Sequence, residues 1–317
     1  MKNKCLYCYE PIENEKDFHT KCSQEFFDTD QPPILAYSLD QMNELAKEVV
    51  ERSIAVPGVQ PKLSLSLLDD VEDKEAGRLT VVGALGGNYI FKPPSTLYPE
   101  MPQNEHVTMR IAESFGINVV PSSLIRLASG ELAYITKRID RTSEGEKIHM
   151  LDMFQITEAY DKYKSSMEKI GKALEAYSTN TGLDKIFFFE LVVFSFLTGN
   201  NDMHLKNFSM ILNDGKWLLA PAYDLLNVSL VNPEDKEEMA LTINGKKNKL
   251  TQMDFEYLGE NMGLTNKQIS GVFKRMIDKR KLFKSWLNKS NLSNDMCKEY
   301  ERIFLLRCAL LASKKIA

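Results

Sequence analysis

Apolar and polar positions along the chain follow two different periods, and the change between them falls near residue 140. Upstream, short runs alternate apolar with polar residues. Residues 63–68 alternate Leu with Ser, which predicts a strand exposed on one face. Downstream, longer runs repeat apolar residues every three or four positions, as helices do. The pattern predicts an α+β fold in which strands come first and helices follow.

The strand-rich part is predicted to hold three hairpins and two helices. A charged loop over 69–78 closes the first hairpin, Gly86-Gly87 the second and Ser129-Gly130 the third. Asp40 is the expected N-cap of the first helix. The expected strands are 63–68, 79–85, 88–92, 124–127 and 132–139, and the expected helices are 40–52 and 104–115.

The second part is predicted to be helical apart from one small hairpin around Asn213-Asp214-Gly215, with strands 208–212 and 217–220. The apolar side chains of 183–197 would form the core of this part. The expected helices are 148–158, 165–179, 182–199 and several within 265–317.

Composition places the chain among ordinary globular proteins. Of its 317 residues, 43% are apolar and 26% are charged, which excludes a disordered, collagen-like or disulfide-scaffold protein. The most apolar stretch, 186–197, is shorter than the ~18 residues that cross a membrane. The first residues, MKNKCLYCYE, lack the apolar core of a secretory signal. We therefore expect a cytoplasmic protein with reduced thiols and no membrane segment.

Four potential metal ligands crowd into the first 22 residues. Cys5-x2-Cys8 and His19-x2-Cys22 are two close pairs of soft ligands, a spacing typical of a tetrahedral zinc site. The first pair would lie on a tight turn and the second on the first turn of a short helix. So small a segment buries too little apolar area to fold alone, and Zn²⁺ would stabilise it. The alternative is a buried cluster of reduced cysteines with an incidental histidine.

Charge is distributed unevenly along the chain. Residues 1–30 carry four Lys against seven acidic residues, a net charge of −3, which makes this segment a poor candidate for direct DNA binding. Residues 264–317 carry 13 Lys and Arg against four acidic residues, a net charge of +9. Two interpretations of this basic end stay open: solvated helix faces, or a docking surface for an acidic partner such as nucleic acid.

The segment TGNNDMHLKNFS at 198–209 carries the chemistry. Asp202 and Asn207 have the D-x4-N spacing of a protein-kinase catalytic loop, in which the Asp accepts a proton and the Asn holds Mg²⁺. Asp224 follows after a short apolar hairpin, where a kinase places its second magnesium ligand. His204, within the loop, is expected to pack and to hydrogen-bond the loop backbone.

A kinase also needs a lysine on a strand and a glutamate on the following helix. Lys92 ends an apolar strand, and Glu105 lies 13 residues later in a predicted helix. A surface lysine at a strand end and a first-turn acid favoured by the helix dipole are the simpler alternatives. A turn upstream contains one glycine, so it is not a G-x-G-x-x-G loop, but its N–H groups and Lys62 would suit phosphate. The turn comprises Pro57, Gly58, Val59, Gln60, Pro61 and Lys62, and Val56 precedes it.

Together these segments resemble the HipA family of bacterial serine/threonine kinases, which are often toxins of type II toxin–antitoxin pairs. Motif order and spacing agree over roughly residues 36–317. The segments are GVQPKLS at 58–64, the Lys92 strand, NE at 104–105, KRIDR at 137–141, GNNDMHLKNFS at 199–209 and YDLL at 223–226.

The resemblance implies a bilobal, protein-kinase-like fold with ATP between a strand-rich N-lobe (34–140) and a helical C-lobe (141–317), preceded by a zinc knuckle (1–33). By resemblance, Asp202 would be the catalytic base, and Asn207 and Asp224 would be the magnesium ligands. Lys92, which Glu105 would hold in place, would bind the ATP phosphates. The backbone of Val56–Gln60 with Lys62 would form the phosphate loop, and the backbone near Lys137 and Ile139 would meet the adenine.

The resemblance also implies partners. Family substrates include aminoacyl-tRNA synthetases, and the usual antitoxin is a small helix-turn-helix protein. This chain lacks the family's longer N-terminal subdomain, so a separate small protein could supply it. Ala55 stands where many members carry an autophosphorylated serine, and Ser53 is close but out of register. A small-molecule kinase of the same fold and a nucleotide-binding scaffold without transfer activity remain as alternatives.

Overall fold

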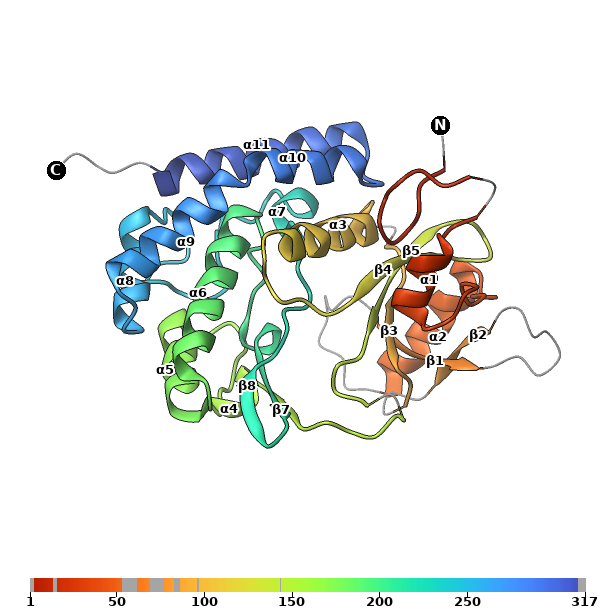
Figure 1. The fold of residues 1–317 in the computed structure, drawn as a ribbon, viewed down its shortest axis with the longest axis horizontal. Coiled ribbons are helices and arrows are strands. Elements are labelled where there is room, and N and C mark those ends of the chain that lie inside the picture. The colour runs from red at the N-terminus through yellow and green to blue at the C-terminus, as the bar shows by residue number, and fades with distance from the viewer. Residues whose placement is uncertain are drawn as a thin grey trace. The chain divides into compact units, whose positions relative to one another are not determined.

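The computed structural model describes residues 3–13, 16–52, 62–68, 77–82, 86–95, 97–142 and 144–312. Two compact units form. Unit 1 comprises Met1–His106, Val120–Lys147 and Lys289–Asn291, and unit 2 comprises Val107–Val119, Ile148–Asn288 and Leu292–Ala317. Figure 1 shows strands concentrated in the first unit and helices in the second. The three-domain division at residues 33 and 140 stays a prediction.

Unit 1 is built on a five-stranded antiparallel sheet with the order β2-β1-β3-β5-β4. Alternation of Leu and Ser along β1 buries Leu63 and Leu65 on one face, as the sequence pattern predicts. Its strands are β1 (Leu63–Leu68), β2 (Arg78–Val82), β3 (Tyr89–Lys92), β4 (Ser122–Arg126) and β5 (Leu132–Lys137), and its helices are α1 (Thr20–Phe27), α2 (Leu39–Arg52) and the start of α3 (Met101–Ser114).

The predicted hairpin across Gly86-Gly87 is wrong, because β2 and β3 pair with opposite edges of β1. Gly87 has a φ of 78°, and a Cβ there would lie 2.5 Å from the Leu65 carbonyl oxygen. This glycine is therefore needed for a close approach to β1 rather than for a hairpin turn. The charged segment after β1 does join an antiparallel pair, with Leu68 opposite Arg78.

The cap of α2 also differs from the prediction. Helix α2 begins at Leu39, so Asp40 lies inside its first turn. Ser38 takes the capping position: its hydroxyl accepts from the Gln41 N–H, and the Gln41 side chain accepts from the Ser38 N–H. This reciprocal pair satisfies two donors at once, which a lone Asp40 cap would not.

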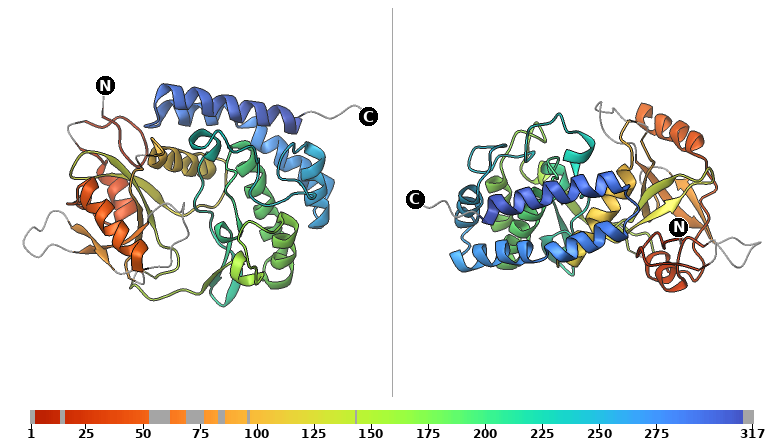
Figure 2. Two further views of the ribbon diagram at one scale, coloured as in Figure 1. Left: turned by 180° about the vertical axis from the view of Figure 1, so that it is seen from behind. Right: turned by 90° about the horizontal axis from the view of Figure 1, so that it is seen from above.

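Unit 2 surrounds the buried helix α6 (Thr181–Leu197), which α5, α9 and α11 contact. Apolar side chains cover every side of its second half, as expected for a helix enclosed in a core. Figure 2 shows α10 and α11 side by side, and the Phe283 and Phe304 rings stack between them with centroids 3.8 Å apart.

The remaining elements of unit 2 include a three-stranded sheet of order β6-β7-β8. The helix predicted over 148–158 is wrong: this segment pairs with β7 as a strand and then forms a four-residue helix, which Asp152 caps. The elements are β6 (Met150–Asp152), α4 (Met153–Ile156), α5 (Met167–Tyr177), η1 (Leu205–Asn207), β7 (Ser209–Asn213), β8 (Lys216–Leu219), α7 (Val228–Val231), α8 (Gln252–Asn261), α9 (Asn266–Asp278), α10 (Arg280–Lys289) and α11 (Asn294–Ala312). None of the described helices has the length and apolar character to span a bilayer.

Candidate active site and metal cluster

Lys92 and Glu105 form a buried ion pair in unit 1. Lys92 ends β3, and its Nζ lies 2.7 Å from Oε1 of Glu105 on α3. Their side chains are 11% and 1% exposed, and the ammonium also lies over the Tyr134 ring. Glu105 lies in the second turn of α3, so a first-turn acid favoured by the helix dipole does not explain it. The two side chains are therefore paired as the kinase pattern predicts.

The predicted phosphate and adenine segments are only partly described. Residues 53–61, which include Ser53 and Val56 to Gln60, lie outside the described residues, and Lys62 is exposed immediately before β1. At the end of β5, the Lys137 ammonium pairs with Asp28, and the Lys137 backbone N–H donates to the Pro121 carbonyl oxygen. The Lys137 N–H and ammonium are thus engaged within unit 1, and the predicted adenine contacts of the backbone near Lys137 and Ile139 stay predictions.

The end of helix α6 delivers the chain into the predicted catalytic loop. Gly199 has a φ of 75°, and a Cβ on it would lie 2.5 Å from the Asn227 side-chain oxygen. From α11, the buried guanidinium of Arg307 donates to the Phe196 carbonyl oxygen at 2.5 Å. A cation at the C-terminal end of a helix also offsets its dipole. Two independent contacts thus fix the entry to the loop.

Within the loop, Asn207 faces back towards Asp202. The Asn207 Nδ2 donates to the Asp202 carbonyl oxygen at 3.0 Å, which leaves its Oδ1 as an acceptor. Asp224 follows β8 with a φ of 60°, a left-handed conformation that is uncommon outside glycine and tends to occur at functional positions. The Asn200 amide contacts the Asp224 carbonyl oxygen at 3.5 Å, so the loop and Asp224 are linked. An amide oxygen and a carboxylate are donors that suit Mg²⁺.

Groups around Asp202 shift the pKa of its carboxyl in opposite directions. Burial raises the pKa of the Asp202 carboxyl above its ordinary value, and the Asp224 carboxylate raises it further. The Tyr163 hydroxyl donates to Asp202 Oδ1 at 3.0 Å, and the neighbouring Lys162 also favours the ionised form. Sequence reasoning missed Tyr163 and Lys162, because they precede the loop by about 40 residues and belong to no recognised motif.

His204 packs, as expected, while Nδ1 of its ring makes no hydrogen bond to the described backbone. The imidazole is buried edge-on to the Tyr163 ring, with centroids 5.1 Å apart. Its Nδ1 has no hydrogen-bond partner among the described residues. Burial lowers the pKa of His204 to about 4, and Lys162 contributes to this shift. The ring is therefore neutral at pH 7 and does not supply a charge to the loop.

The four predicted zinc ligands come together in unit 1. His19 occupies the N-cap position of α1 and Cys22 its first turn, as predicted. The ligand atoms of Cys5, Cys8, His19 and Cys22, here named the Cys/His cluster, all lie within 4.8 Å of one another. A hydrogen bond from the Cys8 thiol lowers the pKa of Cys5 to about 4 and raises that of Cys8. Three thiols and one imidazole are the donor set of a structural zinc site.

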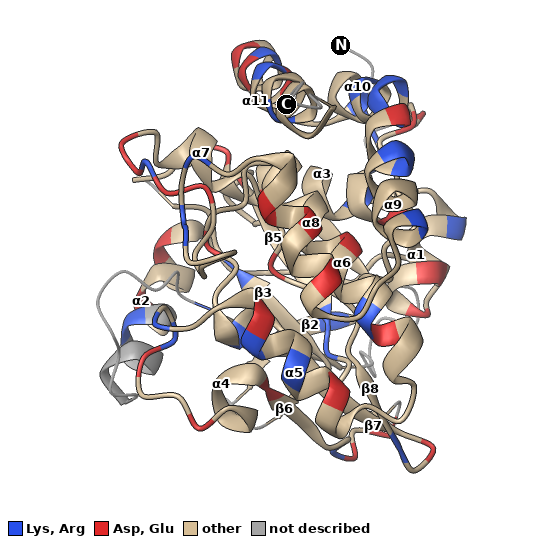
Figure 3. Cartoon of the chain, turned by 90° about the vertical axis from the view of Figure 1, so that its left-hand side faces the viewer, with Lys and Arg blue, Asp and Glu red and all other residues tan. Residues whose placement is uncertain are grey.

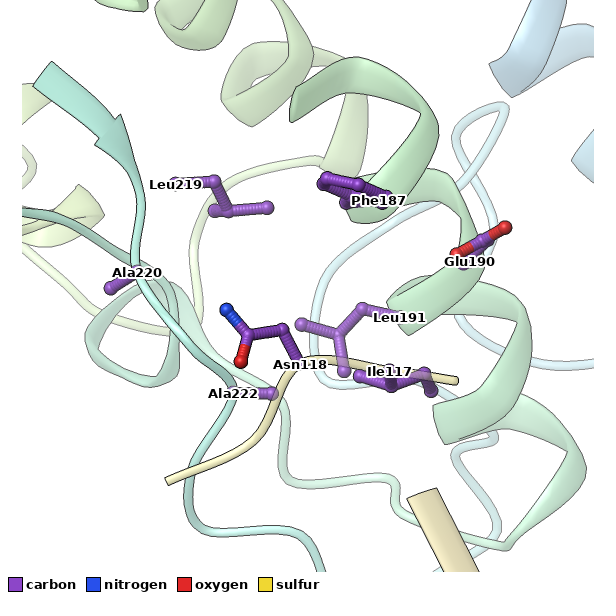
Figure 4. A pocket seen from close by; sticks show the side chains of 8 residues that line it. All are labelled: Ile117, Asn118, Phe187, Glu190, Leu191, Leu219, Ala220 and Ala222. Atoms are coloured by element: carbon purple, nitrogen blue, oxygen red, sulfur yellow. The ribbon is translucent and has the colours of Figure 1, made fainter. Parts of the chain in front are cut away.

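A pocket in unit 2 is separate from these residues. It has a volume of about 30 Å³, which is room for roughly one water molecule. Figure 4 shows mainly apolar side chains around it, from α6, the end of β8 and the segment after α3. The pocket is too small for a nucleotide. Its lining residues are Ile117, Asn118, Phe187, Glu190, Leu191, Leu219, Ala220 and Ala222.

Several basic side chains of residues 264–312 have partners within the protein. Figure 3 shows Lys and Arg along α9 and α10. Arg275 pairs with Glu190, and Lys284 pairs with Glu301. Lys279 donates to the Phe115 carbonyl oxygen. These contacts account for part of the basic end, and both interpretations of its charge stay predictions.

Comparison with known proteins identifies the same family as the motifs. Residues 54–282 match the family described as HipA-like C-terminal domain. A Haemophilus influenzae protein named "Putative kinase" is 29% identical over 248 residues, which are 69% of this chain and 70% of that protein. The Shewanella oneidensis serine/threonine-protein kinase toxin HipA is 26% identical over 212 residues, 60% of this chain. The match spans only 47% of that toxin.

Solved structures agree on the fold. A chain of the S. oneidensis complex of HipA, HipB and operator DNA aligns with a TM-score of 0.68 at 21% identity, over 85% of this chain and 73% of its own. The Helicobacter pylori proinflammatory kinase CtkA aligns with a TM-score of 0.53 at 16% identity, over 73% of this chain and 90% of its own. The mixed α/β fold is therefore kinase-like. Because the family model matches residues 54–282, which are most of the chain, the chain belongs to the HipA-like family.

Proposed function

We propose that this protein is a Mg²⁺-dependent kinase that transfers the γ-phosphoryl group of ATP to a hydroxyl group of a protein. The observation that carries the proposal is the hydrogen bond from Asn207 Nδ2 to the Asp202 carbonyl oxygen. It orients the amide so that Oδ1 remains free for a hard cation, in the same loop that holds a base. The strained φ of Asp224 supports a second ligand position.

In the proposed reaction, Asp202 accepts the proton of the substrate hydroxyl as the hydroxyl oxygen bonds to the γ-phosphorus. The bond between that phosphorus and the β–γ bridging oxygen breaks, and ADP leaves. Asn207 and Asp224 would hold Mg²⁺, which supplies positive charge at the phosphate oxygens when bound. Lys92, oriented by Glu105, offsets charge on the same phosphates.

The family relatives suggest a substrate and partners. The S. oneidensis relative is named a serine/threonine-protein kinase toxin, and its structure is a complex with HipB and operator DNA. We extend this to the present chain: its substrate would be a protein of the kind that the family phosphorylates, such as an aminoacyl-tRNA synthetase, and its partner a small helix-turn-helix antitoxin. A separate small partner protein belongs to the same proposal.

Asp202→Ala tests the proposal. We expect the substitution to abolish phosphoryl transfer while MgATP binding stays within about threefold, because a base acts on the hydroxyl and not on the nucleotide. Asp295→Ala, at an exposed carboxylate of α11, is the matched control and should retain activity. Phosphoryl transfer at the wild-type rate by Asp202→Ala would reject the assignment.

A phosphoproteomic comparison of the wild type with Asp202→Ala separates the alternatives. New phosphoproteins in the wild type alone support a protein substrate. ATP turnover without any new phosphoprotein would indicate a small-molecule kinase of the same fold. ATP binding without turnover would indicate a nucleotide-binding scaffold.

A further inference from the structure

The Cys/His cluster of the knuckle (residues 1–33) lies in unit 1 and does not include the residues that would act on ATP. We propose that the Cys/His cluster binds one zinc ion, and that this ion keeps the knuckle in the position from which Tyr9 fixes helix α3. Zinc is thus a structural cofactor of the helix that presents Glu105 to Lys92. The metal site stands independently of the proposed kinase function, whereas its effect on nucleotide binding rests on that function.

The cluster has the dimensions of a tetrahedral zinc site. Bonds of about 2.3 Å to sulfur and 2.0–2.1 Å to nitrogen place neighbouring ligand atoms roughly 3.5–3.8 Å apart. His19 Nδ1 lies 3.5 Å from Cys8 Sγ and 3.7 Å from Cys22 Sγ. All four ligand atoms fall within 4.8 Å of one another. Four protein ligands complete the coordination, so the site leaves no open position for catalysis.

The second nitrogen of His19 supports metal binding. Its Nε2 lies 3.1 Å from the Pro11 carbonyl oxygen, which can only accept a hydrogen bond. The proton of a neutral imidazole is therefore assigned to Nε2, and the Nδ1 lone pair faces the thiols. A backbone carbonyl in this position is the usual orienting partner of a zinc-bound histidine. An incidental histidine beside three cysteines would not require this tautomer.

The turn that carries the cysteines needs a source of stability. Cys5 donates its N–H to the Glu10 carbonyl oxygen, and the Tyr9 N–H returns to the Cys5 carbonyl oxygen. Closing this turn forces Tyr9 to a φ of 64°, a left-handed conformation that costs of order 1 kcal/mol or more for such a residue. A metal ion bound across the turn offsets this cost, because its binding free energy is available only in the folded state.

Tyr9 connects the turn directly to helix α3. Its hydroxyl lies 2.7 Å from Nδ1 of His106, and the two rings meet edge-on with centroids 5.0 Å apart. Both side chains are at most 1% exposed. His106 is the next residue after Glu105, so a displaced Tyr9 would shift the carboxylate that holds Lys92. A hydrogen bond in so dry an environment is costly to leave unmade.

The other side of the knuckle packs on the sheet of unit 1. Phe26 and Phe27 of α1 are buried against each other and against Tyr89 of β3, with centroids 5.9 and 6.0 Å from that ring. The Leu124 N–H of β4 donates to the Leu6 carbonyl oxygen. The knuckle therefore contacts both the strand that ends in Lys92 and the helix that carries Glu105, and the ion acts on both through one rigid turn.

Metal content of the full chain tests the site. We expect about one zinc per chain by elemental analysis after purification without chelator, and less than about 0.2 after Cys8→Ser or Cys22→Ser. Cys297→Ser, a cysteine substitution in α11 of unit 2, is the matched control and should retain the metal. Wild-type protein with no zinc and no uptake of added Zn²⁺ would overturn the proposal.

Hydrogen exchange of the full chain tests the positioning role. Tyr9→Phe should keep about one zinc but raise the exchange rates of the amides in 101–110 by about five- to tenfold, because one buried hydrogen bond is lost. Tyr7→Phe removes a hydroxyl that bonds Glu25 within the knuckle and should leave that peptide within twofold of the wild type. Equal exchange in Tyr9→Phe and the wild type would overturn the role of Tyr9.

A nucleotide titration separates this inference from the proposed function. If the protein is a kinase, Tyr9→Phe should weaken MgATP binding by about three- to tenfold, and Tyr7→Phe should not. If the wild type binds no nucleotide, the kinase proposal fails, whereas the zinc content and the exchange of 101–110 still decide the metal site and the link to α3.

Discussion

The two half-sites, Lys92 with Glu105 in unit 1 and Asp202 with Asp224 in unit 2, differ in how their charges are compensated. In unit 1, Lys92 and Glu105 neutralise each other at 2.7 Å, and both are nearly buried. In unit 2, burial disfavours the ionised form of Asp202, and the carboxylate of Asp224 adds to that effect. The first half is complete in the absence of a ligand, while the second half gains from added positive charge. Breaking the pair in unit 1 is therefore expected to destabilise the fold, whereas neutralising Asp202 in unit 2 is expected to stabilise it.

The largest effect on stability should come from breaking the pair in unit 1. We expect Lys92→Met to lower the free energy of unfolding by about 3–5 kcal/mol, because the buried Glu105 loses its ammonium partner, and to weaken MgATP binding. Urea denaturation and a nucleotide titration measure the two effects. Lys137→Met breaks a more exposed pair with Asp28 and should cost less than about 1 kcal/mol.

The double variant Lys92→Met/Glu105→Gln sharpens this result. Removing the carboxylate charge as well should recover a large part of the lost stability, since no uncompensated buried charge remains. A double variant as unstable as the sum of the two single variants would show that the pair is not coupled and would contradict the account of unit 1.

The next effect is a pH dependence that arises in unit 2. The pKa of His204 is about 4 in the folded protein and about 6.5 when unfolded, so its contribution is present above pH 6.5 and is lost as the pH falls towards 4. From this group alone, we expect the free energy of unfolding to be about 2 kcal/mol lower at pH 5 than at pH 7. His204→Gln should reduce that difference, whereas His149→Gln, at an exposed position, should not.

Neutralising Asp202 should change the free energy of unfolding by a smaller amount than Lys92→Met does, and in the opposite direction. Asp202→Asn removes a charge that burial disfavours but keeps an acceptor for the Tyr163 hydroxyl. We expect the metal-free protein to gain about 1 kcal/mol, or roughly 2–4 °C in melting temperature. Asp214→Asn in the β7–β8 turn is the matched control. A lower melting temperature for Asp202→Asn would contradict the contrast between the two half-sites.

Tyr163→Phe should have the smallest effect of these variants, and the effect should be on kcat. The tyrosine hydroxyl stabilises the ionised form of Asp202, so its loss should raise the pKa of this base. We expect kcat to fall about two- to fivefold at pH 7 while KM for ATP is unchanged, since Tyr163 acts on the base alone. Tyr160→Phe, at a fully exposed position in the same segment, should match the wild type. An unchanged kcat for Tyr163→Phe would show that the hydroxyl does not tune Asp202.

Local signals were sufficient to predict much of the fold and to single out residues that the structure brings into contact, such as Lys92 with Glu105 and Asn207 with Asp202. The long apolar run of α6 and the Asn-Asp-Gly turn between β7 and β8 are decided by neighbouring residues, and both were predicted correctly. The D-x4-N spacing likewise fixes the contact between Asn207 and the Asp202 carbonyl, because it is formed within a single loop. The HipA-like family, identified from motif order, is confirmed by the match over 54–282.

Contacts between residues that are far apart in the chain could not be predicted from local sequence patterns. The pairing of β2 and β3 with opposite edges of β1 depends on which strand edge is free, which no turn signal encodes. The segment at 148–158 has helical periodicity, but the open edge of β7 converts its start into a strand. Tyr163 reaches Asp202 from 39 residues away along the chain, so only the folded structure reveals the contact. The roles of Val56–Gln60 remain predictions.

The contact between Arg307 and the end of α6 links the start of the D-x4-N loop to helix α11. The two residues are 111 positions apart in the chain. At about 5–20 residues per second, a ribosome needs roughly 6–22 s to add the residues between them. During that interval the D-x4-N loop has been synthesised, but the guanidinium that holds its entry has not. The order of synthesis thus leaves the entry to this loop without its guanidinium partner until Arg307 has been added.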